Sequence, residues 1–186
     1  MKKNTRLIIN LAIILIVLSF FVTPLGHEGK IFINRVLSFS PDIIKTENRE
    51  QVDDFDWKLK DEDWSFINFK ESRGKVIFLH FWASWRVPSI AGVKSIQKLY
   101  NDYKDEVVFY IISNEEKEPV EEFMEKNGYD FPVTYLIIGE KMPFDAERIP
   151  STYIIDKDGY IAIEKEGMAN WNSDDVKSLL DELIAY

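Results

Sequence analysis

The residues that could carry chemistry in this chain gather in one short segment, residues 81–89, which reads FWASWRVPS. The chain has 186 residues and no cysteine. Thiol–disulfide exchange needs a thiolate sulfur as its nucleophile, and no other side chain can supply one. Ser89 is a poor candidate for a serine nucleophile, because no clear base or oxyanion arrangement accompanies it in the sequence. The segment is therefore expected to bind rather than to react.

Histidine gives no better support for catalysis or for a metal site. The chain has only His27 and His80, so a histidine-based metal site is not predicted. His80 lies inside a predicted strand, where a packed, hydrogen-bonded histidine is expected and a role in the site is the alternative. We therefore predict no catalytic residue, no metal and no cofactor.

Arg86 and its tryptophan neighbours are the candidates for binding. Arg86 stands where a helix is predicted to begin, and the helix dipole disfavours a cation there by a few tenths of a kcal/mol up to ~1 kcal/mol. Its guanidinium either points into solvent or joins exposed backbone N–H groups in holding a carboxylate or other anion of a partner. Trp82 is expected in the core. Trp85, beside the turn, is expected to offer a flat apolar contact.

Composition and charge limit the class of protein. Hydrophobic residues make up 46% of the chain, which is ample for one packed domain plus an appendage. The net charge of −9 is unevenly distributed, because Lys2, Lys3 and Arg6 are the only charged residues before His27. An acidic body argues against a nucleic-acid partner, since neutralising phosphates needs a basic face.

The N-terminal region predicts a membrane anchor. Residues 7–22 read LIINLAIILIVLSFFV, and the uncharged run continues to Gly26. About 20 helical residues cross the hydrocarbon layer, so residues 7–25 are predicted to span the inner (cytoplasmic) membrane once. The basic stub at residues 1–6 would then stay in the cytoplasm, with the body on the extracytoplasmic or periplasmic side. A cleaved signal peptide is the alternative, although no small-x-small cleavage site follows the apolar run.

Residues 26–51 are predicted to form a juxtamembrane segment and linker. Gly26 to Gly29 should break the membrane helix. Residues 31–39 then suit either a short amphipathic helix at the membrane surface or a buried extension. Residues 42–51 have the composition of a polar linker.

The folded domain is expected over residues 52–186. Helices are predicted from Pro88 to Tyr103, over 117–127, and after Ser173, which should cap the last helix. Strands are predicted over 55–59, 64–69, 76–82, 107–112, 149–156 and 160–163, with a short strand or extended segment over 131–138. This order implies an α/β sandwich with a central mixed sheet flanked by helices.

Four collinear features carry a family resemblance: Gly74-Lys75-Val76 leading to Phe81-Trp82-Ala83-Ser84-Trp85; Pro88; Ile149-Pro150-Ser151-Thr152; and Ile155-Asp156-Lys157-Asp158-Gly159. On these features, residues 52–186 resemble the thioredoxin-like superfamily, of the membrane-anchored TlpA/ResA type. The resemblance implies the thioredoxin-like fold and a cis-proline at Pro150 that faces the active-site turn. It also places Arg86 and Ser89 where the two redox cysteines would be, and Gly92 where relatives often carry a glutamate.

In active relatives, the surface around the turn and the cis-proline grips an extended polypeptide. The resemblance thus implies a candidate groove formed by Trp85, Arg86, Val87, Ser89, Ile149 and Pro150. We expect a membrane-tethered, redox-inactive binding or scaffolding module, whose partner is a protein or polypeptide. Two alternatives remain: a thiol-disulfide oxidoreductase, as the fold would suggest, and a structural subunit of a membrane complex held through residues 27–51 or the membrane helix.

Overall fold

The computed structural model describes residues 2–22 and 24–186. Its helices are α1 (Lys2–Val22), α2 (Pro24–Val36), α3 (Val87–Tyr103), α4 (Lys117–Asn127) and α5 (Asp174–Ala185), with short 3₁₀ helices η1 (Thr46–Asn48) and η2 (Phe69–Ser72). Its strands are β1 (Lys58–Lys60), β2 (Phe66–Asn68), β3 (Val76–Phe81), β4 (Val107–Ser113), β5 (Val133–Leu136), β6 (Ser151–Ile155) and β7 (Ile161–Glu166).

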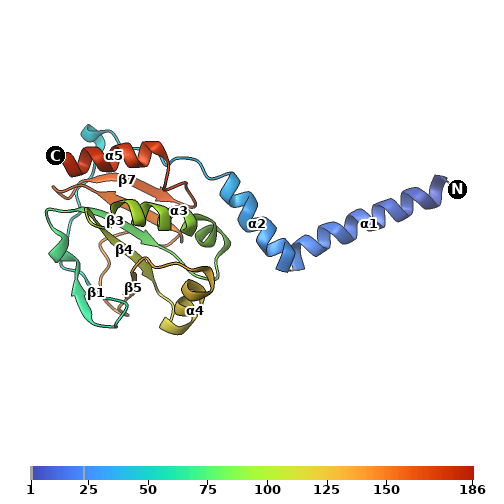
Figure 1. Cartoon of the computed structure of the whole chain (residues 1–186), viewed down its shortest axis with the longest axis horizontal. Coiled ribbons are helices and arrows are strands. Elements are labelled where there is room, and N and C mark those ends of the chain that lie inside the picture. Colours follow the sequence, from blue (N-terminus) through green and yellow to red (C-terminus); the bar gives the residue numbers. More distant parts are fainter. Residues whose placement is uncertain (1, 23) are drawn as a thin grey trace.

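The strands form one mixed sheet in the order β2-β1-β5-β4-β3-β6-β7 (Figure 1). The central strands β3, β4 and β5 run parallel to one another. The β6–β7 hairpin adds antiparallel to β3, and the β1–β2 hairpin adds antiparallel to β5. This confirms the predicted α/β sandwich with a mixed sheet and flanking helices.

The sheet separates two hydrophobic cores, because successive side chains of a strand point to opposite faces. On one face, Phe78 and Trp82 pack with apolar residues of α3, α4 and α5. On the other face, Leu79 and Phe81 pack with an aromatic cluster that includes Trp57 and Phe144. Side chains of the helices therefore pack on one face of β3, and an aromatic cluster packs on the other. The end of β3, from which the turn follows, is thus fixed by packing on both faces.

The structure contains each of the predicted helices and strands of the domain, and their ends differ from the predicted ones by a few residues. Helix α4 ends where expected, with Gly128 in the left-handed conformation at φ 67°. Ser173 caps α5 by accepting a hydrogen bond from the Val176 N–H. The uncertain segment 131–138 contains the regular strand β5, which pairs with both β4 and β1.

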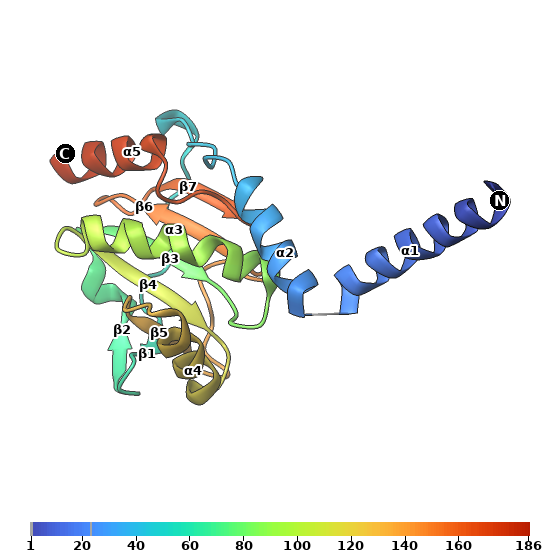
Figure 2. The ribbon, with the colours of Figure 1, turned by 45° about the vertical axis from the view of Figure 1, so that its right-hand side comes forward.

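The N-terminal helices lie outside the sandwich. Helix α2 packs against α3, and α1 extends beyond it, away from the sheet (Figures 1 and 2). The predicted break over Gly26 to Gly29 is wrong, because α2 runs from Pro24 to Val36 through both glycines. None of the helices in the described ranges combines the length and the hydropathy that crossing a membrane would require.

Residues 42–51 lie along the domain. The Ile44 N–H donates to the Ala162 carbonyl of β7 at 2.9 Å, and Gln51 forms an isolated β-bridge with Tyr160. The Arg49 guanidinium meets the Asp156 carboxylate at 3.3 Å, with the two side chains only 9% and 16% exposed. This segment therefore adds polar contacts to the outer edge of the β6–β7 hairpin.

Candidate binding site at the β3–α3 turn

The candidate site is the turn of residues 82–86, which joins the end of β3 to the start of α3. It lies at the carboxyl edge of the parallel β3–β4 pair, where ligands commonly bind in open α/β sheets. The Trp82 N–H donates to the Ile112 carbonyl at 3.0 Å, and the Arg86 N–H donates to the Ala83 carbonyl at 3.2 Å. Backbone hydrogen bonds thus define the path of the turn at both of its ends.

The Ile149–Pro150 peptide bond is cis, as predicted. Ser151 pairs with Phe81 in the antiparallel β3–β6 register, so Pro150 lies opposite the first residue of the turn. Pro150 is buried and Ile149 is half-buried. These two sequence-predicted residues therefore lie beside the turn, although they are far from it in the chain.

Arg86 is the N-cap residue of α3, and its side chain makes no capping hydrogen bond. The Ile90 N–H donates to the Arg86 carbonyl at 3.0 Å, as expected for the first intrahelical hydrogen bond of α3. The N–H groups of Val87 and Ser89 precede it in the first turn of the helix, where no intrahelical carbonyl is available. Arg86 is half-buried and has no ion pair with any residue in the described part of the chain.

Ser89 lies beneath the turn rather than on its surface. Its side chain is buried, and its Oγ accepts a hydrogen bond from the Ala83 N–H at 3.3 Å. A hydroxyl at this place satisfies a backbone donor of the turn. Ser89 therefore supports the turn, while Trp85, Arg86 and Val87 provide its outer part.

The two tryptophans of the segment differ as expected. Trp82 is fully buried and packs edge-on against Phe131, with ring centroids 6.1 Å apart. Trp85 has 67% of its surface exposed. A large aromatic side chain held at the rim of a backbone turn is well suited to contact a partner.

Glu115 holds the turn from the neighbouring strand, and the sequence analysis did not single it out. Its carboxylate accepts the Ser84 N–H at 2.6 Å and the Ser84 hydroxyl at 2.7 Å. The Ser113 hydroxyl donates to the same carboxylate at 3.1 Å. The available signal was the position of Glu115, three residues after the end of the buried strand predicted over 107–112, which lies parallel to β3.

His80 belongs to the core, as expected. Its Nδ1 lies 2.7 Å from the Thr152 Oγ1 and its ring is buried near Trp171. Burial lowers the pKa of His80 to about 3, so the ring is neutral at ordinary pH. Across residues 2–22 and 24–186, no group of three or more His, Asp or Glu side chains is placed to hold a metal ion.

The family follows from the chain's match to a family model. Residues 50–163 match the model of the AhpC/TSA family. The chain belongs to this family. The matched region begins beside Gln51 and ends in β7, so it includes the turn, Glu115 and the cis-proline.

Curated relatives of this family member agree with the resemblance to ResA. The thiol-disulfide oxidoreductase ResA of Bacillus thuringiensis (strain Al Hakam) is 30% identical over 165 residues, which cover 87% of each chain. ResA of Geobacillus kaustophilus is 28% identical over 172 residues, again with 87% of each chain covered. The proteins thus correspond over most of their length.

Solved structures agree on the fold. A secreted thiol-disulfide isomerase from Corynebacterium glutamicum superposes with a TM-score of 0.61 at 18% identity, covering 78% of this chain and 92% of the other. A DsbF homologue from Corynebacterium diphtheriae gives a TM-score of 0.60 at 16% identity, covering 77% and 93%. At these identities the likeness concerns the fold alone.

Proposed function

We propose that this protein is a redox-inactive member of its family that binds a protein or polypeptide partner at the β3–α3 turn. One observation carries the proposal: the turn and the facing cis-Pro150 are present, while Arg86 and Ser89 occupy the positions that the resemblance assigns to redox cysteines. Its relatives are named thiol-disulfide oxidoreductases, but this chain contains no sulfur nucleophile.

The exposed residues of the turn support a role in binding a partner. Trp85 exposes a large aromatic side chain. Beside it, Arg86 offers a cation close to the free N–H groups at the start of α3. An anionic group of a partner, such as a carboxylate, would satisfy both, since charge-assisted hydrogen bonds are the stronger ones. We expect the partner to place an acidic residue at Arg86 and an apolar one against Trp85.

Attachment to a membrane forms the second part of the proposal. We propose that residues 7–25 tether the domain to the extracytoplasmic face of the inner membrane. The support is the uncharged run from Leu7 to Gly26, preceded by Lys2, Lys3 and Arg6. Apolar side chains of α1 such as Leu7 and Leu15 are also at least 60% exposed in the chain by itself.

Photocrosslinking in membranes tests the binding surface. We expect a photoreactive phenylalanine analogue at position 85 of the full chain to capture a partner that the same analogue at position 66 does not. Phe66 is the matched control, because it is an exposed aromatic residue at the far edge of the sheet. Arg86→Ala should reduce capture at position 85 about tenfold if the cation holds an anion of the partner.

Two results would contradict the proposal. Capture through residues 27–51 alone, with none at position 85, would favour the structural-subunit alternative. Reduction of insulin disulfides by the pure protein would show that the chain is an oxidoreductase after all. We expect no turnover in that assay, because each exchange step requires a thiolate.

A further inference from the structure

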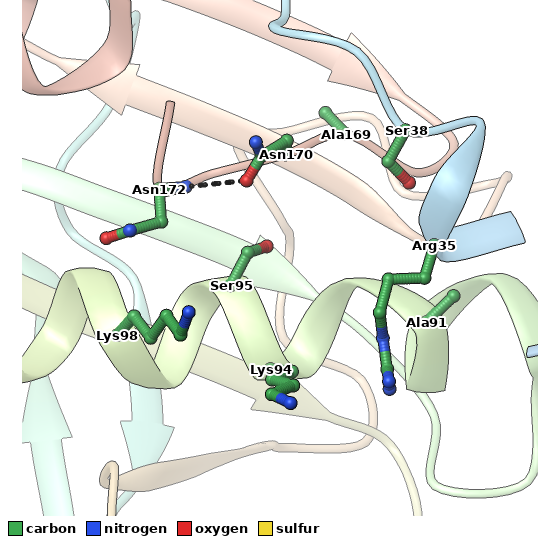
Figure 3. Close-up of a pocket in the computed structure, with 9 residues that line it drawn as sticks. All are labelled: Arg35, Ser38, Ala91, Lys94, Ser95, Lys98, Ala169, Asn170 and Asn172. Carbon is green, nitrogen blue, oxygen red and sulfur yellow. Dashed lines mark hydrogen bonds between the residues drawn. The ribbon is translucent and has the colours of Figure 1, made fainter. Parts of the chain in front are cut away.

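A second site lies on the other side of α3, away from the turn. It is a pocket of about 320 Å³ between the end of α2, the exposed face of α3 and the segment after β7. Figure 3 shows Arg35 reaching from α2 beside the first turns of α3, Lys94 and Lys98 along α3, and Asn170 and Asn172 on the segment after β7. Three segments that are distant in the chain thus contribute to one hollow.

The charge of this pocket is opposite to that of the protein. Its lining includes Arg35, Lys94 and Lys98 and no acidic residue, although the chain carries a net charge of −9. Within the described ranges, none of these three cations has an ion pair. Asp102, four residues after Lys98 on α3, is paired with Lys177 at 2.7 Å, so it does not form an ion pair with Lys98.

The arrangement of the cations is unfavourable without an anion. Lys94 and Lys98 are four residues apart on α3, where like charges destabilise a helix by a few tenths of a kcal/mol. Arg35, on another helix, brings a third positive charge to the same pocket. An anion bound among them would replace this mutual repulsion with attraction.

One neutral group of the pocket, the Asn170 side chain, can also donate to an anion. The Asn170 Oδ1 accepts the Asn172 N–H at 3.3 Å, which leaves the Asn170 amide nitrogen as a donor. The Ser95 hydroxyl, which donates to the Gly92 carbonyl and accepts the Trp171 N–H, fixes the wall between α3 and this segment. Three cations suit a phosphate group better than a single carboxylate, because a phosphate monoester carries nearly two charges at neutral pH.

We propose that this pocket binds a phosphate group through Arg35, Lys94 and Lys98. Arginine can grip two phosphate oxygens at once, and the two lysines contribute point charges on flexible stems. The volume admits a phosphate with a small organic group attached. The phosphate can come from a soluble molecule or from a lipid headgroup, since α2 follows the predicted membrane segment directly.

Titration calorimetry on the full chain in neutral detergent micelles tests this proposal in two arms. The first arm adds inorganic phosphate at constant ionic strength, and the second adds short-chain phosphatidylglycerol or phosphatidylcholine. We expect Lys94→Gln with Lys98→Gln to weaken binding at least about tenfold, since each removes a charged partner of the phosphate. Glutamine is nearly as good a helix former as lysine, so α3 should stay intact.

The control removes the same charge elsewhere. Lys126→Gln with Lys141→Gln changes two exposed lysines outside the pocket and should leave binding within twofold. Binding of phosphate identifies a soluble ligand, and binding of phosphatidylglycerol alone identifies a lipid headgroup. No binding in either arm, or equal weakening in the control, would overturn the proposal. Arg86→Ala should not affect this binding, so a failure of the phosphate-pocket proposal can be distinguished from a failure of the proposal for the β3–α3 turn.

Discussion

At the scale of single residues, the candidate site depends on Arg86 and Ser89, the two residues that the resemblance places at the redox-cysteine positions. Arg86 brings a cation to the start of α3, and Ser89 turns inward to accept the Ala83 N–H. The Glu115 carboxylate accepts two hydrogen bonds from Ser84 of the turn, through its N–H and its hydroxyl, and a third from the Ser113 hydroxyl of β4. Polar groups thus hold the shape of the turn, as the proposed binding surface requires.

His80 makes stability depend on pH. Burial lowers its pKa to about 3, whereas an unfolded histidine titrates near pH 6.5. As pH falls below about 6.5, the unfolded chain takes up a proton that the folded chain excludes, so the free energy of unfolding decreases by up to about 1.4 kcal/mol per pH unit. Urea unfolding between about pH 5 and pH 7 measures this slope.

A double variant isolates the contribution of this ring. His80→Leu with Thr152→Val removes both members of the 2.7 Å hydrogen bond and should give a shallower slope than the parent chain. Thr152→Val alone keeps the titrating ring and should keep the steeper slope. Equal slopes for the parent and the double variant would show that His80 does not titrate between the folded and unfolded states as argued.

At the scale of elements, helix ends decide where the site lies. Pro88 favours the first turn of α3, because its φ suits a helix and its missing N–H costs nothing there. Gly128 ends a different helix, α4, in a left-handed conformation, and the chain then continues to β5. The helix start at Pro88 and the helix end at Gly128 keep the connections to the strands short. Helices α3 and α4 thus connect the parallel strands β3, β4 and β5.

Two glycine substitutions should have opposite effects. Gly128 has φ 67°, and a Cβ there would meet no atom within 4 Å, so Gly128→Ala should cost about 1 kcal/mol through the backbone alone. Gly92 lies inside α3 with equally open space, so Gly92→Ala should add up to about 1 kcal/mol. Urea midpoints compare the two, and shifts in the same direction would contradict this account.

At the scale of the whole molecule, the chain combines an acidic domain with a basic, apolar N-terminal region. Helix α2 lies between them and packs against α3, which lines the proposed phosphate pocket and begins at the turn (Figure 2). The Arg49–Asp156 pair holds the following segment along the β6–β7 hairpin. The α2–α3 contact and this ion pair thus place α2 and the following segment against the domain.

The proposed tether predicts how the full chain fractionates. We expect the chain expressed in bacteria to remain with membranes after an alkaline carbonate wash. Ile13→Arg with Leu15→Arg should release it, because an arginine at the centre of a span costs about 2.5 to 3.5 kcal/mol. Phe66→Arg with Ile138→Arg, two exposed positions of the domain, is the control and should stay bound. Recovery of the parent chain in the soluble fraction would rule the tether out.

The sequence by itself determined the fold class, the absence of cysteine and the place of the turn. These follow from local spacing: buried strands appear as apolar runs, helices as three- and four-residue repeats, and chemistry as residue types. The cis-proline and the exposure of Trp85 also agreed with expectation.

Only the tertiary structure decided which distant residues meet. Glu115 reaches Ser84 because β3 and β4 are parallel neighbours, and Arg35 joins Lys94 because α2 folds against α3. Only the structure shows that the Ser89 side chain points inward, and that α2 continues through Gly26 and Gly29. Such contacts depend on how whole elements pack, which the spacing of residues along one segment does not record.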